Sequence, residues 1–244
     1  MSESLAERLA AVRERMAAAA RRAGRRPEEV TLIGVAKGVT AASIAEAVDA
    51  GLDHVAENYV QEARAKLPEL RARLEALGLP PPQLHFVGRL QRNKAREVAQ
   101  AFDVVESVDR LALGTEIERH AAELGRDLRV LLQVNADAEA GKGGASPEAL
   151  RALLAESAAW KHLRVTGLMM IPAPQSTPEA SRAVFERLRE LALALRTLPG
   201  GGALRELSMG MSADFEVAIE AGATSVRIGT AIFGPRRRGG GEPA

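Results

Sequence analysis

The chain has 244 residues, of which 46% are hydrophobic and only 3% aromatic, so aliphatic side chains must fill a sizeable core. Lys and Arg number 33 and Asp and Glu 32, and the resulting net charge of +1 argues against a broad nucleic-acid-binding surface. The sequence contains no cysteine, which excludes disulfides, thiolate catalysis and cysteine-bound metals, and we expect no metal site.

The first segment predicts an amphipathic helix. Leu5, Leu9, Val12 and Met16 recur at helical spacing, and Gly24 ends the pattern. Glu and Arg residues interrupt the apolar ones, so this segment predicts neither a secretory signal nor a membrane span. We therefore expect a cytoplasmic protein that does not bind membranes.

After this helix, short β-branched runs alternate with amphipathic stretches. The expected strands are Thr31–Lys37, His54–Tyr59, Leu84–Gly88, Asp103–Ser107, Leu128–Asn135, Leu163–Met170, Leu204–Met211 and Ser225–Thr230. The expected helices are Ala41–Ala50, Val60–Leu77, Asn93–Ala101, Arg110–Leu124, Pro147–Trp160, Pro178–Leu198 and Ser212–Ala221. This alternation implies parallel strands joined by right-handed crossovers.

Eight such units predict a single (β/α)8 TIM barrel with an extra N-terminal helix, a fold for which roughly 250 residues is typical. An open, doubly wound sheet is the alternative, and we favour the barrel because the count is eight and no linker divides the chain. We expect residues 1–30 to form a helix packed on the barrel, residues 31–235 to form the barrel, and the Gly-rich residues 236–244 to be a flexible tail.

In a barrel of this kind, functional residues lie at the carboxyl ends of the strands. Lys37 ends the first expected strand, behind a run of apolar residues. Partial desolvation there would lower the pKa of its amine and favour the neutral form that attacks aldehydes. A solvated lysine at a strand boundary is the competing interpretation.

The last two expected strands suggest an anion site. Arg227 lies between two β-branched residues, so it points either outward into solvent or inward to a ligand. Gly229 permits close backbone approach to an anion and Thr230 adds a hydroxyl, at a position where barrels often bind phosphate. Ser212 follows the seventh strand, either as a helix N-cap or as part of the phosphate site.

Other polar residues have weaker interpretations. Asn58 follows the second strand and could contact a ring substituent, whereas His85 suits a hydrogen-bonded core histidine better than a catalyst. The loop with Glu139 and Lys142 either closes over the mouth, with Lys142 available to an anion, or is plainly solvated. A basic stretch is interpreted as a solvated helix face, because no aromatic stacking platform adjoins it. It comprises Arg89, Arg92, Lys94 and Arg96.

Taken in order, the strand ends resemble one family, the pyridoxal phosphate homeostasis proteins, which are relatives of the N-terminal barrel of bacterial alanine racemase. The resemblance runs from about Thr31 to Gly234. The matching segments are Val35–Lys37, Glu57–Glu62, His85–Lys94, Gln133–Asn135, Gly167–Met169, Leu207–Asp214 and Val226–Gly234. Ala36, Ala56 and Leu84 depart from the usual pattern, and they affect how the rim packs rather than the groups assigned to the cofactor.

The resemblance implies that pyridoxal 5′-phosphate (PLP) is the cofactor, held as an imine on Lys37. It further implies that the phosphate is held by Ser212, Gly229 and Thr230. Arg227 would face the pyridine nitrogen and Asn58 would line the ring. We include His85 among the cofactor-binding residues.

The resemblance also implies a protein for intracellular PLP homeostasis, which buffers PLP or delivers it to apo-enzymes with little or no turnover. Arg227 supports a carrier, because a guanidinium cannot accept the proton that an acidic residue keeps on the ring nitrogen in carbanion-forming enzymes. Racemisation needs acid/base groups on both faces of the substrate, and we expect no second domain after Gly234 to supply one. We expect a monomer.

Three alternatives remain open from the residues. The first is a PLP-dependent amino-acid racemase in which His85 or a partner subunit supplies the missing base. The second is an aldolase that uses a lysine imine on a sugar phosphate. The third is an RNA- or protein-binding module that uses Arg89–Arg96.

Overall fold

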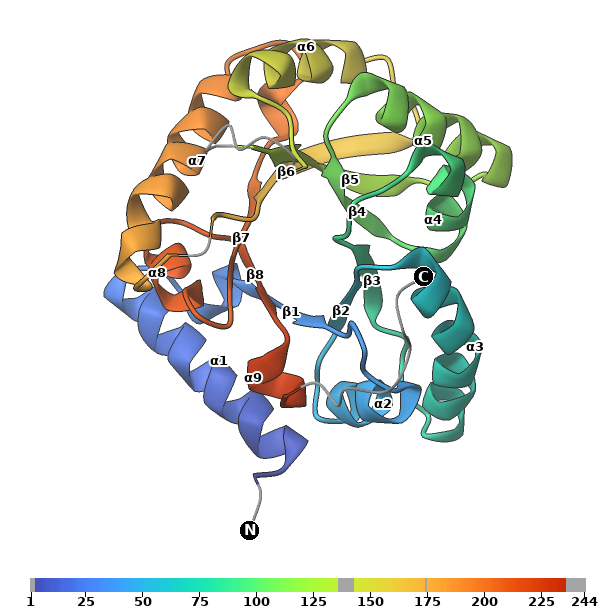
Figure 1. Cartoon of the computed structure of the whole chain (residues 1–244), viewed down its shortest axis with the longest axis vertical. Helices are drawn as coiled ribbons and strands as arrows, with labels where there is room; N and C mark the ends of the chain where they lie inside the picture. Colours follow the sequence, from blue (N-terminus) through green and yellow to red (C-terminus); the bar gives the residue numbers. More distant parts are fainter. Residues whose placement is uncertain (1–2, 136–142, 174, 236–244) are drawn as a thin grey trace.

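The computed structural model describes residues 3–135, 143–173 and 175–235, and it is a closed barrel of parallel strands in the order β1 to β8. The strands form a ring with helices outside it (Figure 1). They are β1 (Thr31–Val35), β2 (His54–Glu57), β3 (Gln83–Phe86), β4 (Val104–Val108), β5 (Leu128–Val134), β6 (Leu163–Met170), β7 (Glu206–Met211) and β8 (Ser225–Ile228). The predicted (β/α)8 barrel is therefore confirmed.

The α-helices follow the strands as expected. They are α1 (Leu5–Arg22), α2 (Ala41–Asp49), α3 (Val60–Ala76), α4 (Ala95–Ala101), α5 (Leu111–Leu124), α6 (Pro147–Ser157), α7 (Arg182–Leu195), α8 (Phe215–Glu220) and α9 (Thr230–Phe233). The short helix α9 falls where the last strand was expected to end, and it was not predicted. None of the helices in the described part of the chain is long and apolar enough to cross a membrane.

The barrel closes between its first and last strands. Thr31 is in register with Ser225, and Gly34 with Ile228. Gly34 packs against Leu52, and a Cβ at this position would lie 2.5 Å from a Leu52 methyl carbon. The small residue therefore lets β1 approach the chain that precedes β2.

The N-terminal helix α1 covers the barrel where β8 meets β1, beside α8 and α9 (Figure 1). A capping box formed by Ser4 and Glu7 starts it, and its expected apolar face is buried. Arg8 Nε donates to the carbonyl of Ile232 at 2.7 Å, and Arg15 pairs with Glu216 at 2.8 Å. Residues 236–244, expected to be a tail, lie outside the described residues.

The core has two parts. Most buried aliphatic side chains form one large cluster that includes residues from the strands and the surrounding helices. Two small clusters are separate from it, one around Ile33, Ala56 and Val87 and the other around Val104, Leu131 and Met169. Because side chains alternate along each strand, these small clusters belong to the barrel interior, which they share with buried polar groups.

Candidate functional site

Lys37 lies on a tight turn at the carboxyl end of β1, not in the strand as expected. The strand ends at Val35, and the amide of Val39 donates to the carbonyl of Ala36 at 3.0 Å, which closes a turn over Ala36–Val39. Gly38 has φ +72°, a backbone conformation that favours glycine at the third position of such a turn. Lys37 is half-buried, and the backbone of the turn, rather than the alternation of the strand, sets the direction of its side chain.

The Lys37 amine contacts the neighbouring strand end. Its Nζ donates to the hydroxyl of Tyr59 at 2.8 Å and lies 4.6 Å from the centroid of that ring. Tyr59 is exposed, so this hydrogen bond is accessible to solvent. A lysine held in this way at the barrel mouth is open to an incoming aldehyde.

Asn58 directly precedes Tyr59, after β2, where the chain packs tightly on the end of β3. A Cβ at Gly88 would lie 1.9 Å from the carbonyl oxygen of Asn58, so only glycine fits there. In the described part of the chain, Asn58 Oδ1 is buried and has no hydrogen-bond partner. An orphaned buried polar atom of this kind suits a site that a ligand completes.

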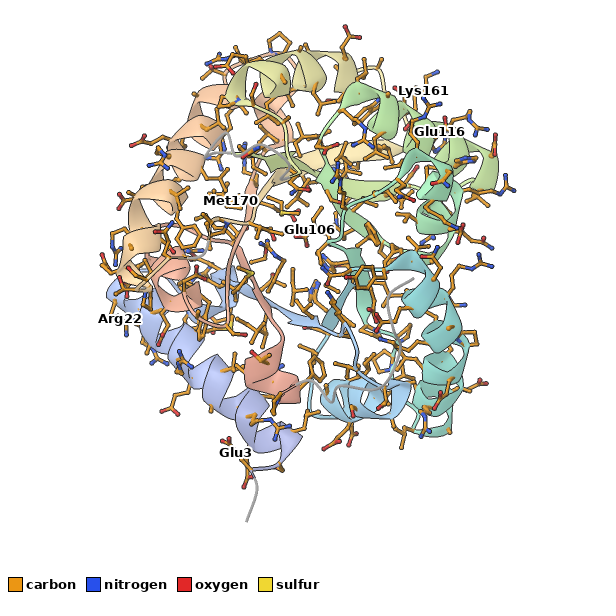
Figure 2. All side chains as sticks on the ribbon, viewed as in Figure 1. Glu3, Arg22, Glu106, Glu116, Lys161 and Met170 are labelled. Carbon is orange, nitrogen blue, oxygen red and sulfur yellow. The ribbon has the colours of Figure 1, made fainter. Side chains whose placement is uncertain are left out.

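Arg227 is buried and points into the barrel, as one of the two interpretations expected, but its guanidinium bonds to groups of the chain itself, and its pairing with a ligand stays a prediction. It donates to Ser208 Oγ at 2.5 Å and to the carbonyl of Met170 at 2.6 Å, and it lies 3.7 Å from Glu106 Oε2. Burial lowers the pKa of Arg227, and the charge of Glu106 opposes this shift. Glu106 lies inside the ring of strands, and Met170 belongs to β6, a strand of the ring itself (Figure 2).

Glu106 is the centre of this buried network, and sequence analysis missed it. His85 Nδ1 lies 2.7 Å from Oε1, and Ser208 Oγ donates to Oε2 at 2.5 Å. Burial would raise the pKa of Glu106, but the hydrogen bond from His85, the charge of Arg227 and the hydrogen bond from Ser208 together lower it. These contacts favour the charged form of Glu106, whose carboxylate lies 3.7 Å from the Arg227 guanidinium.

His85 takes the position expected for a hydrogen-bonded core histidine. Its Nε2 lies 3.0 Å from Nδ1 of His54, and its other ring nitrogen contacts Glu106. Burial, with a contribution from His85, lowers the pKa of His54. Both ring nitrogens of His85 contact other side chains of the protein, which disfavours a direct contact between His85 and the cofactor. That contact stays a prediction.

The expected phosphate-binding residues lie at the ends of β7 and β8. Gly229 is next to β1, since a Cβ there would lie 3.5 Å from the carbonyl oxygen of Val35. Thr230 is exposed and begins α9, where first-turn amides lack intrahelical partners. These residues therefore adjoin the strand that leads to Lys37, and their contact with a phosphate stays a prediction.

The N-cap interpretation of Ser212 is wrong. Helix α8 begins at Phe215 and its N-cap is Asp214, because the chain first makes a turn in which Asp214 N donates to the carbonyl of Met211 at 3.0 Å. Asp214 Oδ1 also accepts from Met211 N at 2.7 Å. Ser212 is half-buried on this turn after β7, and its role in binding phosphate stays a prediction.

A second polar cluster, also missed, lies directly behind the Lys37 turn. Lys66 of α3 forms ion pairs with Glu57 at 2.7 Å and Glu62 at 3.0 Å. Burial raises the pKa of Glu57 to about 7, although the hydrogen bond and charge of Lys66 lower it. One signal for this cluster was present in the sequence, since the acidic Glu57 directly follows the apolar Val55 and Ala56 at the end of β2.

The basic stretch does not form a single helix face, because α4 begins only at Ala95. Arg92, Lys94 and Arg96 pair with the acidic residues Glu116, Glu97 and Glu123, respectively. Arg89 and Lys94 also line a cavity of about 480 Å³ that opens on Asn58 and Tyr59. The expected loop residues Glu139 and Lys142 lie outside the described residues.

Comparison with known proteins is consistent with this geometry. Residues 8–237 match the family model for the N-terminal domain of alanine racemase. The pyridoxal phosphate homeostasis protein of Escherichia coli is 45% identical over 234 residues, covering 95% of this chain and 97% of the relative.

Two kinds of solved structure are similar to the barrel. PipY of Synechococcus elongatus, solved with PLP bound, has a TM-score of 0.81 and 38% identity, covering 95% of this chain and 100% of that one. An alanine racemase from Corynebacterium glutamicum has a TM-score of 0.61 at 19% identity, covering 96% of this chain and 63% of that one, so it shares the fold alone.

Proposed function

The chain belongs to the family of pyridoxal phosphate homeostasis proteins, and from this premise we propose that it binds PLP covalently at Lys37 and buffers or delivers it inside the cell. The observation that carries the proposal is the Lys37 turn at the barrel mouth, where the amine of the half-buried Lys37 lies 2.8 Å from the hydroxyl of Tyr59. Serving as the attachment point for an aldehyde requires such an amine, held in place yet accessible.

The surrounding residues fit PLP. Asn58 offers a buried oxygen that lacks a partner in the described part of the chain, which a bound ring substituent would supply. Gly229 and Thr230 lie beside the strand that ends at the Lys37 turn, and with Ser212 they would hold a phosphate. When bound, PLP supplies an aldehyde that condenses with a primary amine as a Schiff base.

The buried network favours a carrier over an enzyme. Arg227 would face the pyridine nitrogen, and its guanidinium contacts Ser208, the carbonyl of Met170 and the carboxylate of Glu106. A guanidinium cannot take up the proton that an acidic residue would share with the ring, so the ring would be a weak electron sink. Carbanion chemistry is thereby disfavoured, whereas exchange of one amine for another at the aldehyde is not.

In the same proposal, the protein is a cytoplasmic monomer and passes PLP to apo-enzymes. The exposed contact between Lys37 and Tyr59 supports delivery, because the reactive amine is reached from solvent. Transfer to an apo-enzyme should then be faster than spontaneous release of PLP into bulk solvent. If transfer and spontaneous release occur at equal rates, delivery loses its support and the protein acts only as a buffer of PLP.

The proposal is tested by the visible spectrum of the purified protein with added PLP, in wild type and in Lys37→Ala. We expect an imine absorbance band that is lost in Lys37→Ala, and a borohydride label on the Lys37 peptide of the wild type. Lys161→Ala is the control, because Lys161 is exposed on the α6–β6 connection and should keep both signals. A label on another lysine, or none, contradicts the proposal, and α-hydrogen exchange of an amino acid in deuterated water at ordinary enzymatic rates would favour a racemase.

A further inference from the structure

The cluster of Glu57, Glu62 and Lys66 behind Lys37 is more buried than charged side chains usually are. The side chain of Glu57 is 3% exposed and that of Lys66 10%, while Glu62 is 29% exposed. The cluster joins the end of β2 to the first turns of α3. Charges removed from water in this way cost more than an apolar contact of the same size, so fold stability alone gives little reason for them.

The cluster bonds to the backbone on both sides of Lys37. Lys66 Nζ donates to the carbonyl of Ala36 at 2.9 Å, and the amide of Gly38 donates to Glu62 Oε1 at 2.6 Å. The same Oε1 accepts from Lys66 Nζ at 3.0 Å, so the two contacts are linked through one ion pair. The residue that precedes Lys37 and the one that follows it are thus held by the same pair of side chains.

The turn needs such support. Gly38 has φ +72° and no heavy atom within 4 Å of where its Cβ would be, so no van der Waals packing restrains this side of the turn. A glycine turn without restraint samples many conformations, and fixing it costs conformational entropy at the moment of binding. A charged acceptor on the Gly38 amide and a charged donor on the Ala36 carbonyl remove that freedom beforehand.

We propose that Glu62 and Lys66 are positioning residues that fix the Ala36–Val39 turn so that the Lys37 amine is presented to the cofactor. Glu57 holds Lys66 in place through its carboxylate, 2.7 Å from Nζ. This inference rests on the proposed function at Lys37 and adds how the reactive amine is oriented. Neither residue touches the cofactor in this role, since each acts through the backbone of the turn.

The competing explanation is that the cluster only attaches α3 to β2. In that case its loss lowers the melting temperature but leaves PLP binding unchanged. Under our proposal, its loss weakens PLP binding and frees the turn even where the melting temperature is preserved. The two explanations therefore differ in measurable quantities that are separate from global stability.

The test compares three variants on the same helix. Glu62→Ala removes the acceptor for the Gly38 amide, Glu62→Gln keeps a carbonyl oxygen there, and Glu69→Ala changes an exposed acid whose partner is Arg73 on the same helix. In Glu62→Ala we expect the PLP dissociation constant to rise about tenfold, since one hydrogen bond to a charged group is lost. Glu62→Gln should recover most of the affinity, and Glu69→Ala should match the wild type.

Amide hydrogen exchange of the PLP-free protein gives a readout that does not depend on the cofactor. Exchange at Gly38 and Val39 should be faster in Glu62→Ala than in the wild type, by about tenfold or more if the hydrogen bond contributes its usual free energy. Lys66→Met should raise exchange at the same amides and weaken PLP binding. Melting temperatures of all variants identify any that unfold.

Unchanged PLP affinity and unchanged exchange at residues 38–39 in both Glu62→Ala and Lys66→Met would overturn the positioning role. Weakened binding in Glu62→Gln equal to that in Glu62→Ala would also contradict it. Failure of the proposed function is distinguishable, because then the wild type itself forms no imine with PLP. The exchange measurement still decides in that case whether the two side chains hold the turn.

Discussion

Two glutamates of this barrel are almost equally buried, and their pKa values shift in opposite directions. Glu57, behind the Lys37 turn, is 3% exposed, and burial raises its pKa to about 7. Glu106, inside the barrel, is 1% exposed and its pKa is lowered. Burial alone therefore does not decide the charge of a carboxyl group here.

The difference lies in how many partners each carboxyl group has. Glu106 has a partner on each oxygen, His85 on one and Ser208 on the other, and Arg227 nearby. In the described part of the chain, Glu57 Oε2 is buried without a hydrogen bond, and Lys66 contacts only Oε1. A fully satisfied carboxylate stays charged, whereas a half-satisfied one is close to taking up a proton.

The largest effect should come from removing the cation of the interior network. Arg227→Met leaves Glu106 and Ser208 buried without the guanidinium, so we expect the free energy of unfolding to fall by about 3–5 kcal/mol. Urea denaturation at pH 7 measures this change. The double variant Arg227→Met/Glu106→Gln removes both charges and should recover part of the loss.

The stability recovered in the double variant tests the contrast between Glu106 and Glu57. If Glu106 stays charged after Arg227 is removed, its replacement by a neutral amide relieves an uncompensated charge, and the double variant is more stable than the single one. A double variant that is less stable than Arg227→Met would show that Glu106 is stabilising without its arginine, and the contrast with Glu57 would lose its explanation.

A smaller effect is expected from the titration of Glu57. Its folded pKa, about 7, lies above the ordinary value of 4.5, so its contribution to stability is fully present below pH 4.5 and is lost as the pH rises to about 7. The free energy of unfolding of the wild type relative to Glu57→Gln should fall across this window, by about 3 kcal/mol, and stay flat above it.

Denaturation of both proteins at several pH values between 4 and 8 measures this difference. Glu57→Gln is the matched reference, because it has the same shape and does not titrate. A difference between the two proteins that stays constant from pH 4.5 to 7 would mean that Glu57 titrates with an ordinary pKa and that Lys66 compensates fully for its burial.

Much of the barrel was predictable because its signals are local. Short β-branched runs separated by amphipathic segments define strands and helices without knowledge of their partners, and the count of eight then selects the closed barrel. Four strand ends were placed two residues late, as at Lys37, because the polar residue that ends a strand and the turn that follows it look alike in sequence.

The site was predictable only where one residue carries the signal. Lys37 and Asn58 follow the ends of strands β1 and β2, and this position alone marks them. Glu106 offered a weaker signal, since alternation from Val104 places it in the barrel interior, but its partners lie on other strands. The link from Lys66 to the carbonyl of Ala36 depends on how α3 packs on the end of β1, which no local pattern encodes.

The smallest effect should come from the exposed contact at the mouth. Tyr59 is 51% exposed, so its hydroxyl competes with water for the Lys37 amine, and Tyr59→Phe keeps the ring against Nζ. We expect the PLP dissociation constant to rise by about threefold or less, because a solvated hydrogen bond contributes little net free energy. Fluorescence titration of the PLP-free protein measures it, with Glu62→Ala alongside. If Tyr59→Phe weakens PLP binding more than Glu62→Ala does, the exposed Tyr59 side chain orients the Lys37 amine more strongly than the buried cluster does.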